Sequence, residues 1–377
     1  MLIDKLDASV IKNYCKYLES VGMISGLSSD SESPYINSRV VENIFCMVTG
    51  ALNLGRADCS VDAKLDKVGV GIKTFLANNN RTMQKIAEFN KDAFKLRNQN
   101  SVEIVNLISK LRNERILTTM RIYGLETMIY HCIIRDPNLI RIYECSMDLI
   151  DIKKIKNIQT NNNIISFEDS KNIYSFNLSK NTLYKRFFTE DSICSIKVEM
   201  IDKPFELLAK LITESSELDK KVTGNKLESI ILPLFSDRGT RHVPERSGLN
   251  QWNAHGRLRN INEIYIPIPA WIQRRYPDFF PGRDISFNLE LPNENIMSAK
   301  ICQQGEKALM SNPNRDLGNW LLREVMNLEE GELLTYDKLQ DIGIDSVEVY
   351  KIDSNNYKID FRSIGTFDEF YDEFKRN

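Results

Sequence analysis

The residues best suited to chemistry in this chain are arginines concentrated in one stretch. Between Ser236 and Arg283 there are eight arginines and no lysine, against four acidic residues, so the stretch has a charge of +4 in a chain of formal charge −2. A guanidinium group can hold a phosphate or the edge of a guanine through two parallel hydrogen bonds, which an ammonium group cannot do. This choice of cation favours recognition of nucleic acid.

Amide side chains accompany the arginines, and amides can bond to adenine in the major groove through two hydrogen bonds. Two loops, around 238–259 and 303–315, carry the side chains that we predict to contact DNA. They are Arg238, Arg241, Arg246, Ser247, Asn250, Gln251, Trp252, Asn253, Arg257, Arg259, Gln303, Gln304, Lys307, Ser311, Asn312, Asn314 and Arg315. The alternative is a solvated polar loop whose arginines pair with neighbouring acids such as Asp237, Glu245 and Asp284.

The order of short motifs in this region resembles a known recognition domain. It contains SGLNQWNAHGRLRNINEIYIPIPAWI, then PDFFPGRD, then AKICQQGEKALMSNPN followed by LGNWLLR. These are similar to the C-terminal DNA-recognition domain of NgoFVII-type restriction endonucleases, which is itself similar to those of BfiI and EcoRII and to the plant B-three domain. The resemblance implies a β pseudo-barrel with two helices, whose two loops grip the major groove like a wrench.

A second candidate site lies in the segment SVDAKLDKVGVGIKTF. Asp62 on one short strand and Lys73 on the next resemble the core of PD-(D/E)XK nucleases, in which carboxylates bind Mg²⁺ and a lysine assists by its charge. That core often takes a further glutamate from the preceding helix, where Glu42 stands. The resemblance implies Mg²⁺-dependent hydrolysis of phosphodiester bonds by these residues.

The chain departs from this pattern at Gly71, which occupies the place of the motif's acid. We expect Glu88, fifteen residues after Lys73 on the following helix, to supply the missing carboxylate, so Asp62 and Glu88 are the predicted metal ligands. Asp58 and Asp66 are weaker substitutes. The competing interpretation is a surface hairpin whose Asp and Lys are merely solvated.

The sequence lacks the catalytic motifs of other classes of hydrolase. None of the three histidines, His131, His242 and His255, begins the H-x-K pattern of phospholipase D-like nucleases, and there is no G-x-S-x-G, P-loop or dinucleotide-binding glycine pattern. His131 lies in an apolar strand and is expected to be a hydrogen-bonded core residue.

Composition places these sites in a two-domain globular protein. The 377 residues are 42% hydrophobic and 27% charged, and the seven cysteines are odd in number without a C-x-x-C, which predicts reduced core residues. There is no signal-peptide pattern and no apolar run of membrane-spanning length, so a cytoplasmic protein that does not contact a membrane is expected.

The elements that must position these residues follow from periodicity and composition. The N-terminal domain, 1–224, is expected to be an α/β nuclease domain and the C-terminal domain, 225–377, a β pseudo-barrel, which gives an α+β chain. Predicted helices cover 6–25, 38–54, 81–97, 101–117, 203–221, 316–327 and 335–343, with a linker over 222–226. Predicted strands cover 60–66, 68–76, several runs between 126 and 190, and short runs near 227–235, 263–268, 285–291, 297–302, 345–351 and 356–361.

The function predicted from these observations is that of a type II restriction endonuclease acting on double-stranded DNA with Mg²⁺. Such an enzyme is expected to cut as a homodimer and to work beside a cognate DNA methyltransferase. The alternative is a non-catalytic, sequence-specific DNA-binding regulator whose N-terminal domain dimerises. RNA is disfavoured, because an RNA duplex hides the major groove that these side chains suit.

Overall fold

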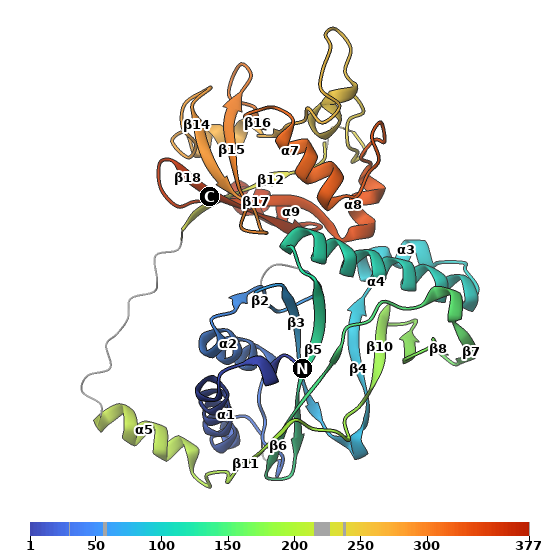
Figure 1. Cartoon of the computed structure of the whole chain (residues 1–377), viewed down its shortest axis with the longest axis vertical. Coiled ribbons are helices and arrows are strands. Elements are labelled where there is room, and N and C mark those ends of the chain that lie inside the picture. The colour runs from blue at the N-terminus through green and yellow to red at the C-terminus, as the bar shows by residue number, and fades with distance from the viewer. Residues whose placement is uncertain (30, 56–58, 215–226, 237–238, 377) are drawn as a thin grey trace. The chain divides into compact units, whose positions relative to one another are not determined.

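The computed structural model describes residues 1–29, 31–55, 59–214, 227–236 and 239–376 of the chain (Figure 1). It divides into two compact units. The first comprises Met1–Ile116 and Leu125–Val222, and the second comprises Leu117–Gly124 and Thr223–Asn377. Over the described residues, no helix has the length and apolar character needed to cross a membrane.

A mixed sheet forms the centre of the first unit. Its strands lie in the order β1-β2-β3-β5-β6-β11, with β3 and β5 parallel and the other neighbours antiparallel. The strands are β1 (Leu52–Asn53), β2 (Ala63–Leu65), β3 (Val68–Leu76), β5 (Thr127–Asp136), β6 (Leu139–Ser146) and β11 (Cys194–Lys197). The hairpin predicted over 60–66 and 68–76 is therefore confirmed as β2 and β3.

Two helices cover one face of this sheet, α1 (Ala8–Met23) and α2 (Ser38–Thr49) (Figure 1). Both were predicted from the sequence, but the second was expected to run to residue 54, whereas residues 52–53 form β1. The Asn37 side chain caps α2 by accepting a hydrogen bond from the backbone N–H of Arg39, and Gly50 ends the helix with a φ of 75° that favours glycine. Their apolar sides meet alternate residues of the strands, such as Val70, Ile72 and Ile133.

A second, antiparallel sheet in this unit has the order β4-β10-β9-β8-β7. Its strands are β4 (Arg81–Glu88), β10 (Thr182–Phe188), β9 (Ile173–Asn177), β8 (Ile164–Glu168) and β7 (Lys156–Asn161). Apolar residues of α4 (Ser101–Tyr123), including Val105 and Ile108, pack with Phe176 and Leu183 of this sheet in one buried cluster. The unit also contains α3 (Ala93–Leu96) and α5 (Pro204–Glu214); the rest of the helix predicted to residue 221 and the linker 222–226 lie outside the described residues.

The helix predicted over 81–97 is wrong. Residues Arg81–Glu88 form β4, which pairs with β10 along its whole length, and only the four residues of α3 are α-helical. The register passes from Lys85 to Ala87 and leaves Ile86 as an extra residue in a bulge. This bulge interrupts the alternation expected of a strand, and the resulting spacing of Met83, Ile86 and Phe89 imitates a helical stripe.

The second unit contains a seven-stranded, nearly closed barrel-like sheet in the order β12-β17-β18-β14-β15-β16-β13. Its edge strands β12 and β13 lie in contact. The strands are β12 (Glu228–Pro233), β13 (Ile266–Pro267), β14 (Ser286–Glu290), β15 (Ile296–Cys302), β16 (Ala308–Ser311), β17 (Ile344–Lys351) and β18 (Asn356–Ser363). The predicted barrel architecture of this part of the chain is confirmed.

The barrel carries more helix than the two segments predicted. Those two are present as α7 (Asp316–Gly318), which continues into a π-helical segment Asn319–Val325, and as α8 (Tyr336–Ile342). The structure adds α6 (Ala270–Arg275) and α9 (Thr366–Arg376). Four aromatic side chains of α9 surround Trp271 of α6, a contact between segments far apart in the sequence that periodicity within either segment does not predict.

The barrel buries one carboxylate with few donors. Asp345 of β17 is fully buried, and it accepts a 3.3 Å hydrogen bond from the Gly365 N–H and a 3.2 Å bond from the Ser346 hydroxyl. The pKa of Asp345 is raised to about 6, and burial is the main cause. The charge of Asp368 also raises this pKa, whereas the two hydrogen bonds and the charge of Arg241 lower it. The folded state therefore holds the proton of the Asp345 carboxyl group more tightly than the unfolded chain does. The contribution of Asp345 to the free energy of unfolding is most favourable below about pH 4 and is lost as the pH rises to about 6.

We therefore predict that Asp345→Asn stabilises the protein at pH 7. The amide keeps an acceptor for Gly365 without a buried charge, so the free energy of unfolding at pH 7 should rise by roughly 1–3 kcal/mol, with little change at pH 4. Urea unfolding at the two pH values measures this, with the exposed Asp372→Asn as the control. A loss of stability at pH 7 would show that the ionised form of Asp345 is needed.

Candidate nucleic-acid interface and hydrolytic site

The β2–β3 hairpin fixes Asp62 beside β3. The backbone N–H of Asp62 donates to Val70 O, and its Oδ2 accepts a 2.6 Å bond from the N–H of Ile72. Asp62 stands immediately before β2, whose first residue Ala63 pairs with Val70, and the charge of Lys73 on β3 acts on its carboxylate. The hairpin thus holds the predicted aspartate near enough to the predicted lysine for their charges to interact.

The surroundings of Asp62 include three further charges. Burial raises the pKa of Asp62, while the bond from Ile72 and the charges of Lys73 and Arg39 lower it and Glu42 raises it. Glu42 is buried on α2, where its Oε2 accepts a 2.7 Å hydrogen bond from Nη1 of Arg39. Two other predicted catalytic residues, Lys73 and Glu42, therefore lie near enough to Asp62 for their charges to shift its pKa. Arg39 is a further charged residue near Asp62 that was not predicted. Its only signal in the sequence is the i, i+3 spacing to Glu42, which allows an ion pair on one helix.

Glu88 does not join this group. It ends β4 in the second sheet, where its carboxylate is bonded to Lys85 and to the side-chain amide of Asn90. The reason for selecting it, its expected place on the helix after the second strand, fails because residues 81–88 form a strand. Of the weaker substitutes, Asp66 lies in the turn between β2 and β3 with a φ of 52°, and Asp58 lies outside the described residues.

The position of the motif's missing acid is filled by neighbours. A Cβ atom on Gly71 would lie 2.6 Å from Cε of Met147 and 3.4 Å from the ring of Tyr130. The absence of a side chain at position 71 is what allows Met147 to pack there. Within the described ranges, no three His, Cys, Asp or Glu side chains lie close enough together to hold a metal ion.

In the second unit, a buried carboxylate organises the first of the two predicted loops. Glu263 is 3% exposed, and it accepts hydrogen bonds from both terminal nitrogens of Arg257 and a 3.1 Å bond from Nε2 of Gln251. Nε of Arg259 lies 3.7 Å from the same carboxylate, and its Nη1 donates a 2.7 Å bond to Ala254 O. These three predicted DNA contacts therefore brace the loop.

Two other predicted contacts are buried, and we correct them to structural residues. The side chain of Asn250 is fully buried, where it donates to Leu334 O and Pro244 O and accepts from Leu334 N–H. Ser311 is also fully buried and accepts a 2.8 Å bond from the N–H of Leu317 at the start of the following helix. Neither side chain can reach a duplex in this conformation.

The remaining predicted contacts differ in their exposure and in whether they bond to other residues of the protein. Arg241 is exposed, but it pairs with Asp368 at 2.6 Å and lies over the ring of Phe235. Asn253 donates to Glu245 O, Asn312 to Ser286 Oγ, and Arg315 lies near Asp316. Trp252 is half-buried, and Arg238 lies outside the described residues. The side chains left exposed or half-exposed and available to a ligand are Arg246, Ser247, Gln303, Gln304, Lys307 and Asn314.

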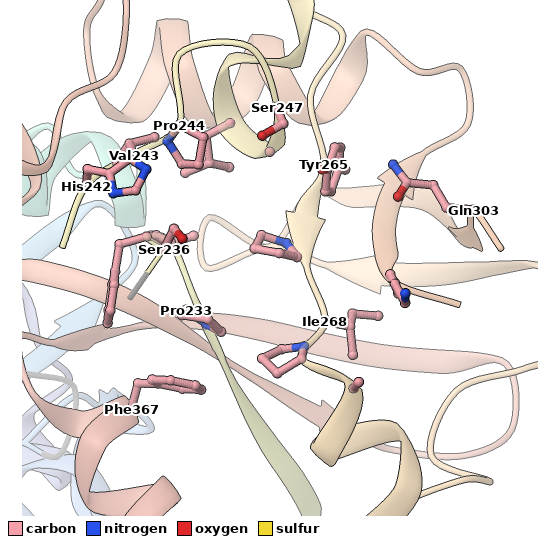
Figure 2. A pocket seen from close by; sticks show the side chains of 18 of the residues that line it. Pro233, Ser236, His242, Val243, Pro244, Ser247, Tyr265, Ile268, Gln303 and Phe367 are labelled. Atoms are coloured by element: carbon pink, nitrogen blue, oxygen red, sulfur yellow. The ribbon is translucent and has the colours of Figure 1, made fainter. Parts of the chain in front are cut away.

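A cavity of about 590 Å³ lies between the two predicted loops (Figure 2). Ser247 lines it from the first loop, and Gln303 and Lys307 line it from the second, which connects β15 to β16. Figure 2 shows Ser236 and His242 on the side of the cavity opposite Gln303. Most other residues that line the cavity are apolar, among them Pro233, Ile268 and Phe367.

The second unit thus combines a barrel-like sheet with two polar loops that line one cavity. Residues 222–353 match the family model of the NgoFVII C-terminal B3-like DNA-binding domain. The C-terminal part of the chain is therefore similar to the DNA-binding domain of a restriction enzyme, and the predicted resemblance is confirmed for this part. No curated protein matches the chain.

We predict that buried and exposed amides of this interface respond differently to substitution. Asn250→Ala should lower the free energy of unfolding by about 2 kcal/mol, because it leaves buried backbone groups of Leu334 without partners. Gln304→Ala, at an exposed position, should change stability by less than about 0.5 kcal/mol and should alter which DNA sequences are bound. Urea unfolding and selection from a random duplex pool measure the two effects. A destabilised Gln304→Ala variant would contradict the assignment.

Proposed function

We propose that this protein is a sequence-specific endonuclease of double-stranded DNA, of the type II restriction class. The observation that carries the proposal is the grouping of Asp62, Lys73 and Glu42 around one hairpin, in a chain with a restriction-type DNA-binding domain. The elements α2, β2, β3 and α4 follow the order of helix, two strands and helix expected for a PD-(D/E)XK core, with β1 between α2 and β2 and with β4 and α3 between β3 and α4. The parallel pairing of β3 with β5 then anchors the strand that carries Lys73.

Asp62 and Glu42 are the side chains that would hold Mg²⁺. Two carboxylates are compatible with this ion when waters and substrate phosphates complete its octahedral oxygen shell. When bound, Mg²⁺ would activate a water molecule and stabilise charge on the scissile phosphate. Lys73 would add a fixed positive charge beside that phosphate, and Arg39 would hold Glu42 in place.

The proposed partners follow from the reaction. Cutting both strands of a duplex requires two active sites, so we propose that the protein acts as a homodimer on DNA. A cell that contains a sequence-specific nuclease must protect its own sites, so we propose a DNA methyltransferase of matching specificity as its functional counterpart.

One observation favours a second function. The acid of the motif is replaced by Gly71, and Met147 fills the space, so the described residues provide two carboxylates where the motif has more. This favours a DNA-binding regulator without nuclease activity, whose first unit would serve assembly. Metal-dependent cleavage distinguishes the two functions.

We predict that Asp62→Asn and Lys73→Ala each reduce cleavage of duplex DNA by at least about a hundredfold, because each removes charge stabilisation at the phosphate. Binding of the recognised sequence should be unchanged, since it depends on the other unit. Glu88→Ala and Lys85→Ala, which alter an exposed ion pair of the same unit, are the matched controls and should cut normally.

The measurement is cleavage of mixed-sequence DNA by the purified full-length chain with Mg²⁺ or EDTA, followed by sequencing of the ends. Cleavage by both hairpin variants at the wild-type rate would place the active site elsewhere. No cleavage by the wild-type chain with Mg²⁺, together with specific binding, would favour the regulator.

A further inference from the structure

Leu258 has the most exposed large apolar side chain in the described part of the protein. It is 97% exposed, whereas the next values are 70% for Ile296 and 68% for Phe205. An apolar side chain in water forfeits the stabilisation that burial would give. Its position between Arg257 and Arg259, in the matched DNA-binding region, directs attention to DNA as the surface that would bury it.

The loop around Leu258 is braced, so the leucine is held away from the protein. Arg257 and Arg259 reach back to the buried carboxylate of Glu263, and Nη1 of Arg259 also donates to Ala254 O. Gly256, with a φ of 103° and open space where a Cβ atom would lie, forms part of the bend two residues before the leucine. A prefixed apolar tip loses little conformational entropy when it enters a binding site.

The charges around the tip favour a polyanion over another apolar surface. The stretch from Ser236 to Arg283 has eight arginines against four acids. Arg246 on the same loop is exposed, and Arg257 remains 53% exposed while bound to Glu263. A leucine flanked by arginines suits the groove of a nucleic acid, where base edges are apolar in part and phosphates lie on both sides.

We propose that Leu258 is a wedge that inserts between two stacked base pairs of the DNA bound by this domain. The proposal rests on the proposed DNA-binding function and adds to it a residue that deforms the duplex. The side chain separates one base step and bends the helix. Because base steps differ in how easily they open, the wedge contributes to sequence preference without a hydrogen bond to any base.

The test uses the full-length chain in EDTA and duplexes that the wild-type chain selects from a random pool. Two probes report unstacking of the bound duplex, permanganate oxidation of thymines and the fluorescence of 2-aminopurine placed at each adenine in turn. The variants are Leu258→Ala, Leu258→Met and, as a matched control, Ile296→Ala, which removes an exposed apolar side chain at the end of β15 away from the second loop. Thermal unfolding establishes that each variant is folded.

We expect the wild-type chain to make one base step reactive to both probes. Leu258→Ala should abolish this signal and weaken binding roughly tenfold, the loss expected for removing most of a buried leucine side chain. Leu258→Met should retain the signal, and Ile296→Ala should match the wild type in both measurements.

Two results would overturn the wedge. One is an unstacking signal that persists with the Leu258→Ala variant. The other is weaker binding by Leu258→Ala when the duplex bound by the wild-type chain shows no unstacked base, which would make Leu258 a contact on the DNA surface. A wild-type chain that enriches no duplex would instead overturn the proposed DNA-binding function, and the wedge with it.

Discussion

A carboxylate removed from water must be matched by hydrogen-bond donors, and this requirement shapes each of the two units separately. In the first unit, Glu144 is buried against the ring of His131 and accepts the backbone N–H groups of Leu2 and Ile3, so the start of the chain is tied to the central sheet. In the second unit, Glu263 gathers Arg257, Arg259 and Gln251. Glu144 thus joins segments 142 residues apart, whereas Glu263 closes a single loop.

The bracing by Glu263 divides the polar side chains of the DNA-binding loops into two groups. The first group forms hydrogen bonds within the loop and comprises Arg257, Arg259 and Gln251. These bonds fix the position of the other polar side chains of the loop. Those free side chains, such as Arg246, Gln303 and Gln304, lie on loops supported by the barrel. A rigid frame that presents a few unpaired donors is well suited to distinguishing base edges, because little ordering is needed on binding.

The candidate hydrolytic site is shaped by packing as much as by charge. The parallel pairing of β3 with β5 aligns Lys73 with Cys132 and Gly71 with Tyr130, so position 71 lies under Tyr130 and Met147. The hairpin therefore keeps the motif's aspartate and lysine while its third acidic position is filled by an apolar side chain. The proposed enzyme and the alternative regulator differ in whether Asp62 and Glu42 suffice for catalysis.

The sequence by itself determined the features that depend on local spacing and on residue type. These include α1, α2, the β2–β3 hairpin with Asp62 and Lys73, and the order of short motifs in the B3-like region. The tertiary structure decided which polar side chains are free: Asn250 reads like a base-contacting amide until Leu334, 84 residues away, is seen to bind it. It also decided the identity of β4, because pairing with β10 outweighs local helical spacing. Burial and pairing depend on residues distant in the chain, and a single sequence does not record those distances.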